Sequence, residues 1–292
     1  GTKATMPPPV LRLSLRHLLL IVLAQLVALT AQAWLARILR GRGIEDLQAY
    51  YLACVVVPPI LLPMLAPVLL EHRTFLPGLF SPRRLTIRIA LGAVALGMAT
   101  RIVWWSQLIA SVSLGFTASQ DAQTIAGPVF TWACPPLPSL MLGLLVMAVL
   151  IPLMEETVHR GFLQSVFVPA GAVPAILISA AIFTVFHPPS SYGFVFFMGL
   201  VLGVQFWVTG SLWATVITHA TYNGLIQFDW RCLQGHWNPP PDSLPLLLPG
   251  FSALFSLAVA CLLVVALLRS QRAGARAAPA ASVSSARPRH AR

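Results

Sequence analysis

Two adjacent glutamates, Glu155 and Glu156, stand within an otherwise apolar helical pattern. The chain has only eight acidic residues, and the other six lie in polar flanks or loops. Placing a charged side chain at the centre of a bilayer costs about 3 kcal/mol of free energy even by the lower estimates. An ionisable residue at such a position therefore suggests a functional role. The alternative interpretation is that the pair ends a helix at the lipid headgroups.

The spacing of two further residues brings them to the depth of Glu155. Glu155 lies 16 residues before Gly171, which sits in a run of turn residues, and His187 lies 16 residues after it. An antiparallel helical hairpin then places the two side chains at one level, roughly 20 Å from the turn at 1.5 Å rise per residue. His219 lies about eight residues beyond the turn at Gly210. It is therefore predicted above the middle of the membrane, on the side where His187 lies.

Residue types at this level suit the activation of a water molecule. A buried carboxylate beside an imidazole is the arrangement that general-base catalysis requires. His219 and Asn223 share a helix face at i,i+4 and can direct two donors at an oxyanion. Glu156 and Arg160 are also i,i+4, so the guanidinium can neutralise the second carboxylate.

The helices that must position these residues are predicted to span a membrane. The chain of 292 residues is 57% hydrophobic and 9% charged, with a mean hydropathy of +0.80. A spanning helix needs about 20 apolar residues. We therefore expect an all-α, polytopic membrane protein in the cell (inner) membrane, in contact with membrane lipids. The expected spans are eight: 18–36, 49–70, 86–116, 139–168, 175–187, 192–208, 212–228 and 246–268.

The domain organisation follows from these spans. Residues 1–17 are expected to form an N-terminal cytoplasmic segment, 18–268 the transmembrane domain, and 269–292 a disordered basic tail. The net charge of +11 is interpreted as a topology signal. We expect no nucleic-acid partner, because no soluble basic module is present. The stretch Ala31-Gln32-Ala33 leaves open whether residues 1–33 are a cleaved signal.

Positive residues indicate the orientation. The loop with Arg73, Arg83, Arg84 and Arg88 and the six arginines of the tail are placed in the cytoplasm, although Arg37, Arg40 and Arg42 argue the other way. Cys134 and Cys232 then lie outside, where a disulfide is one of the open alternatives. The histidines in flanks, loops and tail are expected to have no specific role; these are His17, His72, His236 and His290.

Three short motifs follow one another on successive predicted helices. Residues 155–160 read EExxxR, residues 183–187 read FxxxH, and residues 219–223 read HxxxN. Each motif alone is weak, but all three in this order resemble the CAAX protease and bacteriocin-processing family, also called CPBP or Abi. The resemblance covers residues 139–228. It implies an eight-helix bundle and an intramembrane endopeptidase that cleaves membrane-anchored proteins or peptides near a hydrophobic C-terminal segment.

The resemblance also implies roles for individual residues. By motif position, Glu155 with His187 would activate the water, and His219 with Asn223 would stabilise the oxyanion. Glu156 and Arg160 would hold the first glutamate in place. The family has been described both as metalloproteases and as metal-free glutamate proteases, and no metal is assigned from the sequence.

One position departs from the family pattern. Before Arg160 the family usually carries an aromatic or aliphatic residue, and this chain has His159, which is i,i+4 from Glu155. If zinc is bound, the expected ligands are Glu155, His187, His219 and, as a fourth, His159. His159 can equally tune Glu155 or be a polar side chain of the bundle interior. Arg101 is expected at a similar depth, either paired with a glutamate, snorkelling or lining a cavity.

Two functions of other classes stay open from the sequence. A non-catalytic immunity or scaffold protein could use the polar cluster for helix packing or peptide binding. A proton-coupled transporter could use paired acids and histidines as a relay, although no internal duplication supports it.

Overall fold

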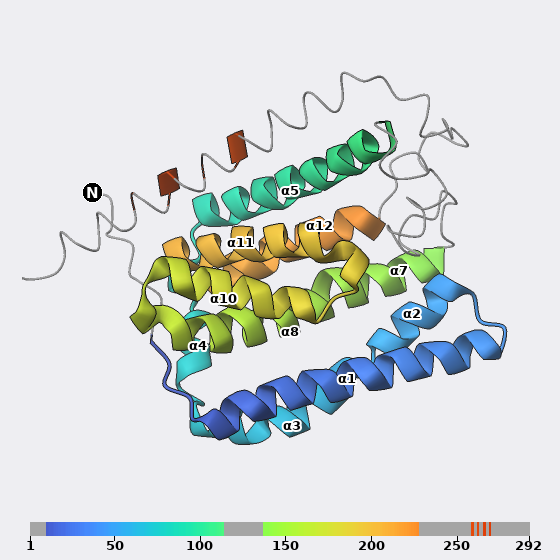
Figure 1. The fold of residues 1–292 in the computed structure, drawn as a ribbon, viewed down its shortest axis with the longest axis horizontal. Coiled ribbons are helices and arrows are strands. Elements are labelled where there is room, and N and C mark those ends of the chain that lie inside the picture. Colours follow the sequence, from blue (N-terminus) through green and yellow to red (C-terminus); the bar gives the residue numbers. More distant parts are fainter. Residues whose placement is uncertain are drawn as a thin grey trace, which may run out of the picture.

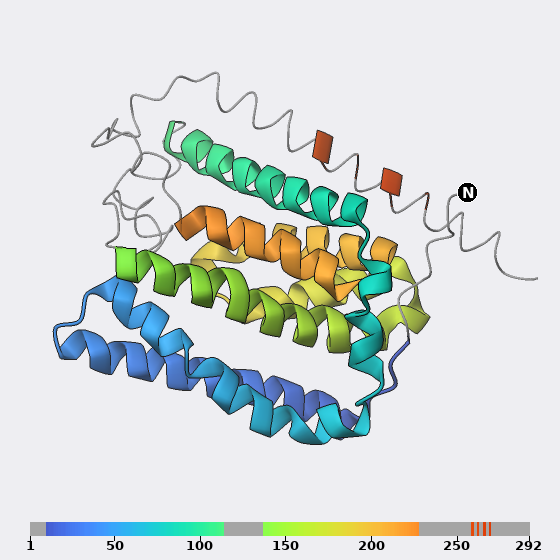
Figure 2. The ribbon, with the colours of Figure 1, turned by 180° about the vertical axis from the view of Figure 1, so that it is seen from behind.

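The structure is a computed structural model that describes residues 10–113 and 137–227, together with a few residues between 258 and 269. Within these ranges every regular element is a helix. The helices form a bundle in which α1, α2 and α3 lie along one edge and α5 along the opposite edge (Figure 1). The view from behind gives the same arrangement, with the helices of residues 137–227 between the two edges (Figure 2).

The first edge is a helical hairpin with a break in its second arm. Helix α1 (Leu15–Gly41) begins at Ser14, whose side chain accepts a hydrogen bond from the His17 amide. Helices α2 (Asp46–Cys54) and α3 (Val57–Glu71) return antiparallel to it. Prolines at the start of α3 lack the amide hydrogen that would continue α2, which accounts for the break.

This edge packs on the next part of the bundle through apolar side chains. Leu11 and residues of α1, of α3 and of the segment 158–163 form one buried cluster. The cluster comprises Leu11, Ile21, Ala24, Ala28, Val57, Leu61, Leu65, Val68, Val158, Phe162 and Leu163. It fixes the first edge against the helix that carries the two glutamates.

A short crossing leads from the first edge to the second. Helix α4 (Phe75–Leu79) and the 3₁₀ turn η1 (Pro82–Arg84) connect α3 to α5 (Ile87–Ser113). Helix α5 packs closely on α12 (Leu212–Gln227) at Gly97, where an added Cβ would lie 2.6 Å from the Thr218 carbonyl oxygen. The Thr218 hydroxyl donates to the Ala93 carbonyl at 2.9 Å, which joins the same two helices.

Residues 137–170 form one long rod whose winding changes along its length. Two π-helical segments, η3 (Val146–Leu150) and η4 (Thr157–Gln164), flank α8 (Ile151–Glu156), which carries both glutamates. The rod begins with α7 (Leu137–Leu145) and ends with α9 (Ser165–Phe167) and the 3₁₀ turn η5 (Val168–Ala170). π-helical turns are rare and occur frequently at functional sites.

The remaining helices return twice along the rod. Gly171, with φ of 99°, begins α10 (Ala172–Val185); the 3₁₀ turn η6 (Pro189–Ser191) leads into α11 (Tyr192–Thr209), and Gly210, with φ of 60°, ends it. A Cβ added at Gly199 would lie 3.0 Å from Ala180, so glycine permits the close packing of α11 on α10. The turn between α10 and α11 stops short of the level that α5 and α7 reach (Figure 1).

Five helical segments of the described residues are long and apolar enough to cross a membrane. They are Leu15–Gly41, Gln48–Glu71, Ile87–Trp104, Leu137–Ala170 and Tyr192–Thr209. Many large apolar side chains on their outer faces are exposed, among them Leu19, Leu62 and Leu91. This pattern is expected where lipid is the solvent, so the predicted all-α polytopic membrane class is confirmed.

The expected number of eight spans is matched only in part by these lengths. Helix α10 has 14 residues and rises about 21 Å at 1.5 Å per residue, which is less than the hydrocarbon thickness of about 30 Å. The break at Pro188-Pro189 sets this short length. The eighth predicted span lies largely outside the described residues, as do Cys134, Cys232 and most of the predicted tail.

Candidate active site

The side chain of Glu156 is fully buried and bound from two sides. Its Oε1 accepts from Arg160 Nη1 at 3.0 Å and lies 2.9 Å from His219 Nδ1. A carboxylate only accepts, so the Nδ1 of His219 carries the hydrogen of this bond. The i,i+4 pair with Arg160 is the one expected from the sequence, and the bond to His219 links the rod to α12.

Arg160 is itself held by a second helix. Its Nη2 donates to the Gly199 carbonyl oxygen at 3.1 Å, and its guanidinium lies over the Phe183 ring, 4.6 Å from the centroid. One turn further along the rod, Gln164 donates to the Gly203 carbonyl at 2.9 Å. Arg160 and Gln164 thus attach the rod to α11, and Arg160 also holds Glu156.

Glu155 differs from its neighbour in both exposure and contacts. Its side chain is 26% exposed, against 0% for Glu156, and its Oε2 lies 3.8 Å from His219 Nε2. That separation is too long for a direct hydrogen bond, and this oxygen has no hydrogen-bond partner among the described residues. Because His219 Nδ1 is engaged by Glu156, the Nε2 nitrogen is the one that faces Glu155.

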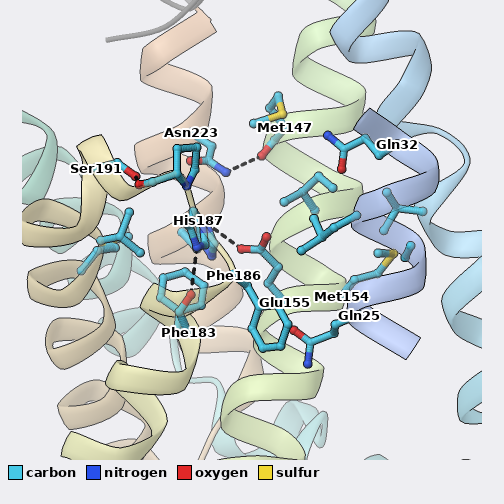
Figure 3. A pocket seen from close by; sticks show the side chains of 18 of the residues that line it. Gln25, Gln32, Met147, Met154, Glu155, Phe183, Phe186, His187, Ser191 and Asn223 are labelled. Atoms are coloured by element: carbon cyan, nitrogen blue, oxygen red, sulfur yellow. Dashed lines mark hydrogen bonds and ion pairs between the residues drawn. The ribbon is translucent and has the colours of Figure 1, made fainter. Parts of the chain in front are cut away.

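His187 follows the end of α10 and is oriented by its own helix. Its Nδ1 lies 2.9 Å from the Phe183 carbonyl oxygen, so this nitrogen carries the hydrogen and Nε2 is left as an acceptor. Figure 3 shows His187 and Glu155 reaching into one pocket from different helices. The structure thus brings His187 to the cavity that Glu155 and His219 also line.

Asn223 lies one turn beyond His219 on α12. Its Nδ2 donates to the Met147 carbonyl oxygen at 2.8 Å, a bond drawn in Figure 3. Met147 belongs to the π segment Val146–Leu150. An amide group has two N–H donors, so one donor of Asn223 positions the side chain and the second remains for a ligand in the cavity.

The segment that carries these residues matches a known family. Residues 137–225 fit the family model of the type II CAAX prenyl endopeptidase Rce1-like proteins. Through this segment the chain is similar to the CAAX protease family, and the match supports that family assignment. No curated protein and no solved structure matches the chain. The family resemblance expected from the three motifs is confirmed.

At family level, the match supports an intramembrane CAAX-type endopeptidase that acts on a protein substrate. The apolar helices make it a multi-pass membrane protein. The match begins at Leu137 and ends at Gly224-Leu225, so it takes in the rod, α10, α11 and most of α12. Helices α1 to α5 lie outside it, although α1, α2, α3 and α5 contribute to the wall of the cavity.

The cavity has a volume of about 670 Å³. One side is formed by Glu155, His187, His219 and Asn223, and the facing side comes from α1 and α2 with Gln25, Gln32 and Tyr50. Figure 3 shows Gln25 and Gln32 on the helix opposite Glu155. These two glutamines were missed in the sequence analysis, because a polar residue on an apolar helix does not reveal which helix it faces.

His159 and Arg101 lie beside the same cavity in different surroundings. His159 is buried against Phe183, with ring centroids 5.0 Å apart, and its Nδ1 has no hydrogen-bond partner within the described ranges. The guanidinium of Arg101 lies over the Trp104 ring, 4.7 Å from the centroid, and 6.0 Å from that of Tyr222. Trp104 and Tyr222 both line the cavity, so Arg101 orders two aromatic rings of its wall.

The residues expected as zinc ligands do not form a compact donor set. In the described part of the chain, ligand atoms of three residues lie within 4.8 Å of one another only for His17, Glu71 and His72. Glu155, His187, His219 and His159 do not meet this condition as a group.

Proposed function

We propose that this CAAX protease family member hydrolyses a peptide bond near the C-terminal end of a membrane-anchored protein or peptide, with Glu155 as general base. The observation that carries the proposal is the environment of Glu155: a partly exposed carboxylate on a cavity, 3.8 Å from His219 Nε2, with one oxygen free of hydrogen-bond partners within the described residues. A carboxylate in this position can take a proton from a water between it and the imidazole.

The chemical step requires the water to attack the substrate carbonyl carbon. The carbon–oxygen bond of the product acid forms, the water proton passes to Glu155, and Glu155 returns it to the leaving amine as the peptide bond breaks. His187, with Nε2 as acceptor, can hold the second hydrogen of the water. The developing oxyanion would be stabilised by His219 Nε2 in its protonated form and by the second N–H of Asn223.

In this proposal Glu156 and Arg160 act through His219. Glu156 fixes the His219 ring by accepting from Nδ1, and Arg160 holds the buried Glu156 side chain through their ion pair. A carboxylate behind an imidazole stabilises the imidazolium form, as in the acid–histidine pairs of other hydrolases. This differs from the expected role of holding Glu155, since within the described residues Glu156 contacts Arg160 and His219.

The substrate class follows from the lining of the cavity. Most of the wall is apolar, with Leu61, Met154 and Phe186 among the contributors, and two glutamine side chains interrupt it. Gln25 Nε2 is buried without a hydrogen-bond partner in the described structure, so it can donate to a backbone carbonyl. An extended, hydrophobic C-terminal segment of a substrate would bury its side chains against this wall. One of its backbone carbonyl groups would accept a hydrogen bond from Gln25 Nε2.

The test is cleavage of a fluorogenic peptide with a hydrophobic C-terminal segment by the purified protein in liposomes. We expect wild-type protein to produce a single new C-terminus, identified by mass spectrometry, and Glu155→Gln and His187→Ala to lose the activity. Glu45→Gln is the matched control, because Glu45 is an exposed glutamate next to α2. Equal rates for all four proteins would exclude the proposed chemistry.

A further inference from the structure

Three side chains of metal-ligating type meet where α1 begins and α3 ends, away from the active site. His17 is in the first turn of α1, Glu71 is the last residue of α3, and His72 follows it. Ligand atoms of these three residues all lie within 4.8 Å of one another. From the sequence, no specific role is expected for His17 and His72, and their separation of 55 residues gives no sign of this contact.

The distances between the donor atoms are compatible with metal coordination. His17 Nε2 lies 3.2 Å from Glu71 Oε2, and His72 Nε2 lies 3.8 Å from Glu71 Oε1. The second distance is beyond a hydrogen bond. Two ligand atoms on a tetrahedral zinc ion, each about 2.0–2.1 Å from the metal, are about 3.3 Å apart, which lies between the two observed values.

The two imidazoles are largely shielded from solvent, and each has a nitrogen without a hydrogen-bond partner in the described part of the chain. The side chains of His17 and His72 are 12% and 18% exposed, and the rings meet edge to face with centroids 5.8 Å apart. His72 Nε2 and His17 Nδ1 have no hydrogen-bond partner among the described residues. Buried polar atoms are normally paired, so an ion on His72 Nε2 would remove one of these two exceptions.

We propose that His17, Glu71 and His72 bind a divalent transition-metal ion of the zinc class. Two imidazoles and one carboxylate are ligands that zinc favours. Calcium is bound by oxygen ligands, so a site with two imidazole nitrogens does not suit it. The Glu71 side chain is 60% exposed, so water completes the fourth position.

The consequence of binding is a link between two antiparallel helices. His17 enters from the start of α1 and the other two ligands from the end of α3, and both helices contribute to the wall of the cavity. Gln25 lies eight residues beyond His17, about 12 Å along the helix axis. The ion is therefore separate from the active-site residues and fixes the edge of the bundle that faces them.

The test measures zinc directly and uses a background without the active-site donors. Full-length protein carrying Glu155→Gln and His187→Ala is stripped with chelator, dialysed against micromolar Zn²⁺ and analysed for bound metal. We expect one zinc ion per chain, and a visible absorption band typical of tetrahedral Co²⁺ when cobalt replaces it. A thermal shift on adding zinc should accompany binding.

Variants of the three ligands decide between the proposal and a simple ion pair. His17→Gln, Glu71→Gln and His72→Gln should each weaken zinc binding by more than about 100-fold, since loss of a second-shell partner alone costs 10–100-fold. Ser14→Ala is the control, because it disturbs the same helix start and keeps all three ligands. Absence of bound zinc in the background protein, or equal zinc content in the ligand variants, would overturn the proposal.

Discussion

Replacing Arg160 by methionine would leave the carboxylate of Glu156 buried with one partner fewer. Glu156 and Arg160 both have fully buried side chains, and their ion pair has an N–O distance of 3.0 Å. Methionine keeps much of the side-chain volume over Phe183 but has no donor for Glu156 or for the Gly199 carbonyl. The cost is therefore electrostatic and due to lost hydrogen bonds rather than to an empty space.

The size of the effect follows from the buried state of both charges. Breaking a buried ion pair by removing one partner destabilises a protein by about 3–5 kcal/mol, because the other charge remains without compensation. Glu156→Gln should cost less than Arg160→Met, because Arg160 keeps its bond to Gly199 at 3.1 Å. In the double variant neither charge is left without its partner. The loss of unfolding free energy should therefore be about 1–3 kcal/mol smaller than the sum of the two single losses.

The assay is a double-mutant cycle of equilibrium unfolding in mixed micelles, followed by circular dichroism. The expected order of stability is wild type, then Glu156→Gln, then Arg160→Met, with the double variant more stable than the sum of the single changes predicts. Additive costs within about 0.5 kcal/mol would refute the reasoning, since they would mean that the two side chains do not interact.

Three further predictions concern packing, the oxyanion and the substrate. Gly199→Ala should cost about 1–3 kcal/mol of unfolding free energy by overpacking, because the added Cβ would lie 3.0 Å from Ala180. Gly193→Ala is the control and should be tolerated, because its Cβ would meet nothing within 4 Å. Equal losses of stability for the two variants in the micelle assay would contradict the close packing of α11 on α10. Asn223→Ala should lower kcat about 10²–10³-fold in the peptide assay, and an unchanged kcat would remove Asn223 from the oxyanion site. Gln25→Leu should raise KM about tenfold with little change in kcat, as expected for one lost hydrogen bond of about 1.5 kcal/mol; a fall in kcat alone would argue against substrate binding by Gln25.

The convergence of the motif residues could be predicted because it depends on regular geometry. Equal counts from the Gly171 turn, at a constant rise per residue, brought Glu155 and His187 to one level, and the structure has both on one cavity. The i,i+4 ion pair of Glu156 and Arg160 follows from the same helical geometry. Local periodicity thus accounts for the part of the site that lies on successive helices.

Contacts between distant helices could not be predicted in the same way. The apolar stretches of α1 and α3 show length and hydropathy but not their neighbours, so neither Gln25 in the cavity nor the meeting of His17 with His72 was foreseen. The two π-helical segments around α8 also have no signal in composition, because they arise from how the rod packs. The only sign in the sequence that α10 is short is the proline pair Pro188-Pro189 that follows it.

The most direct test of the account is the single-turnover rate of peptide hydrolysis by Glu155→Gln, measured together with the dissociation constant of the substrate. If Glu155 is the general base, the rate of the chemical step should fall at least about 10²–10⁴-fold while the dissociation constant stays within a few-fold of wild type. A Glu155→Gln protein that hydrolyses bound substrate at the wild-type rate would contradict the central claim.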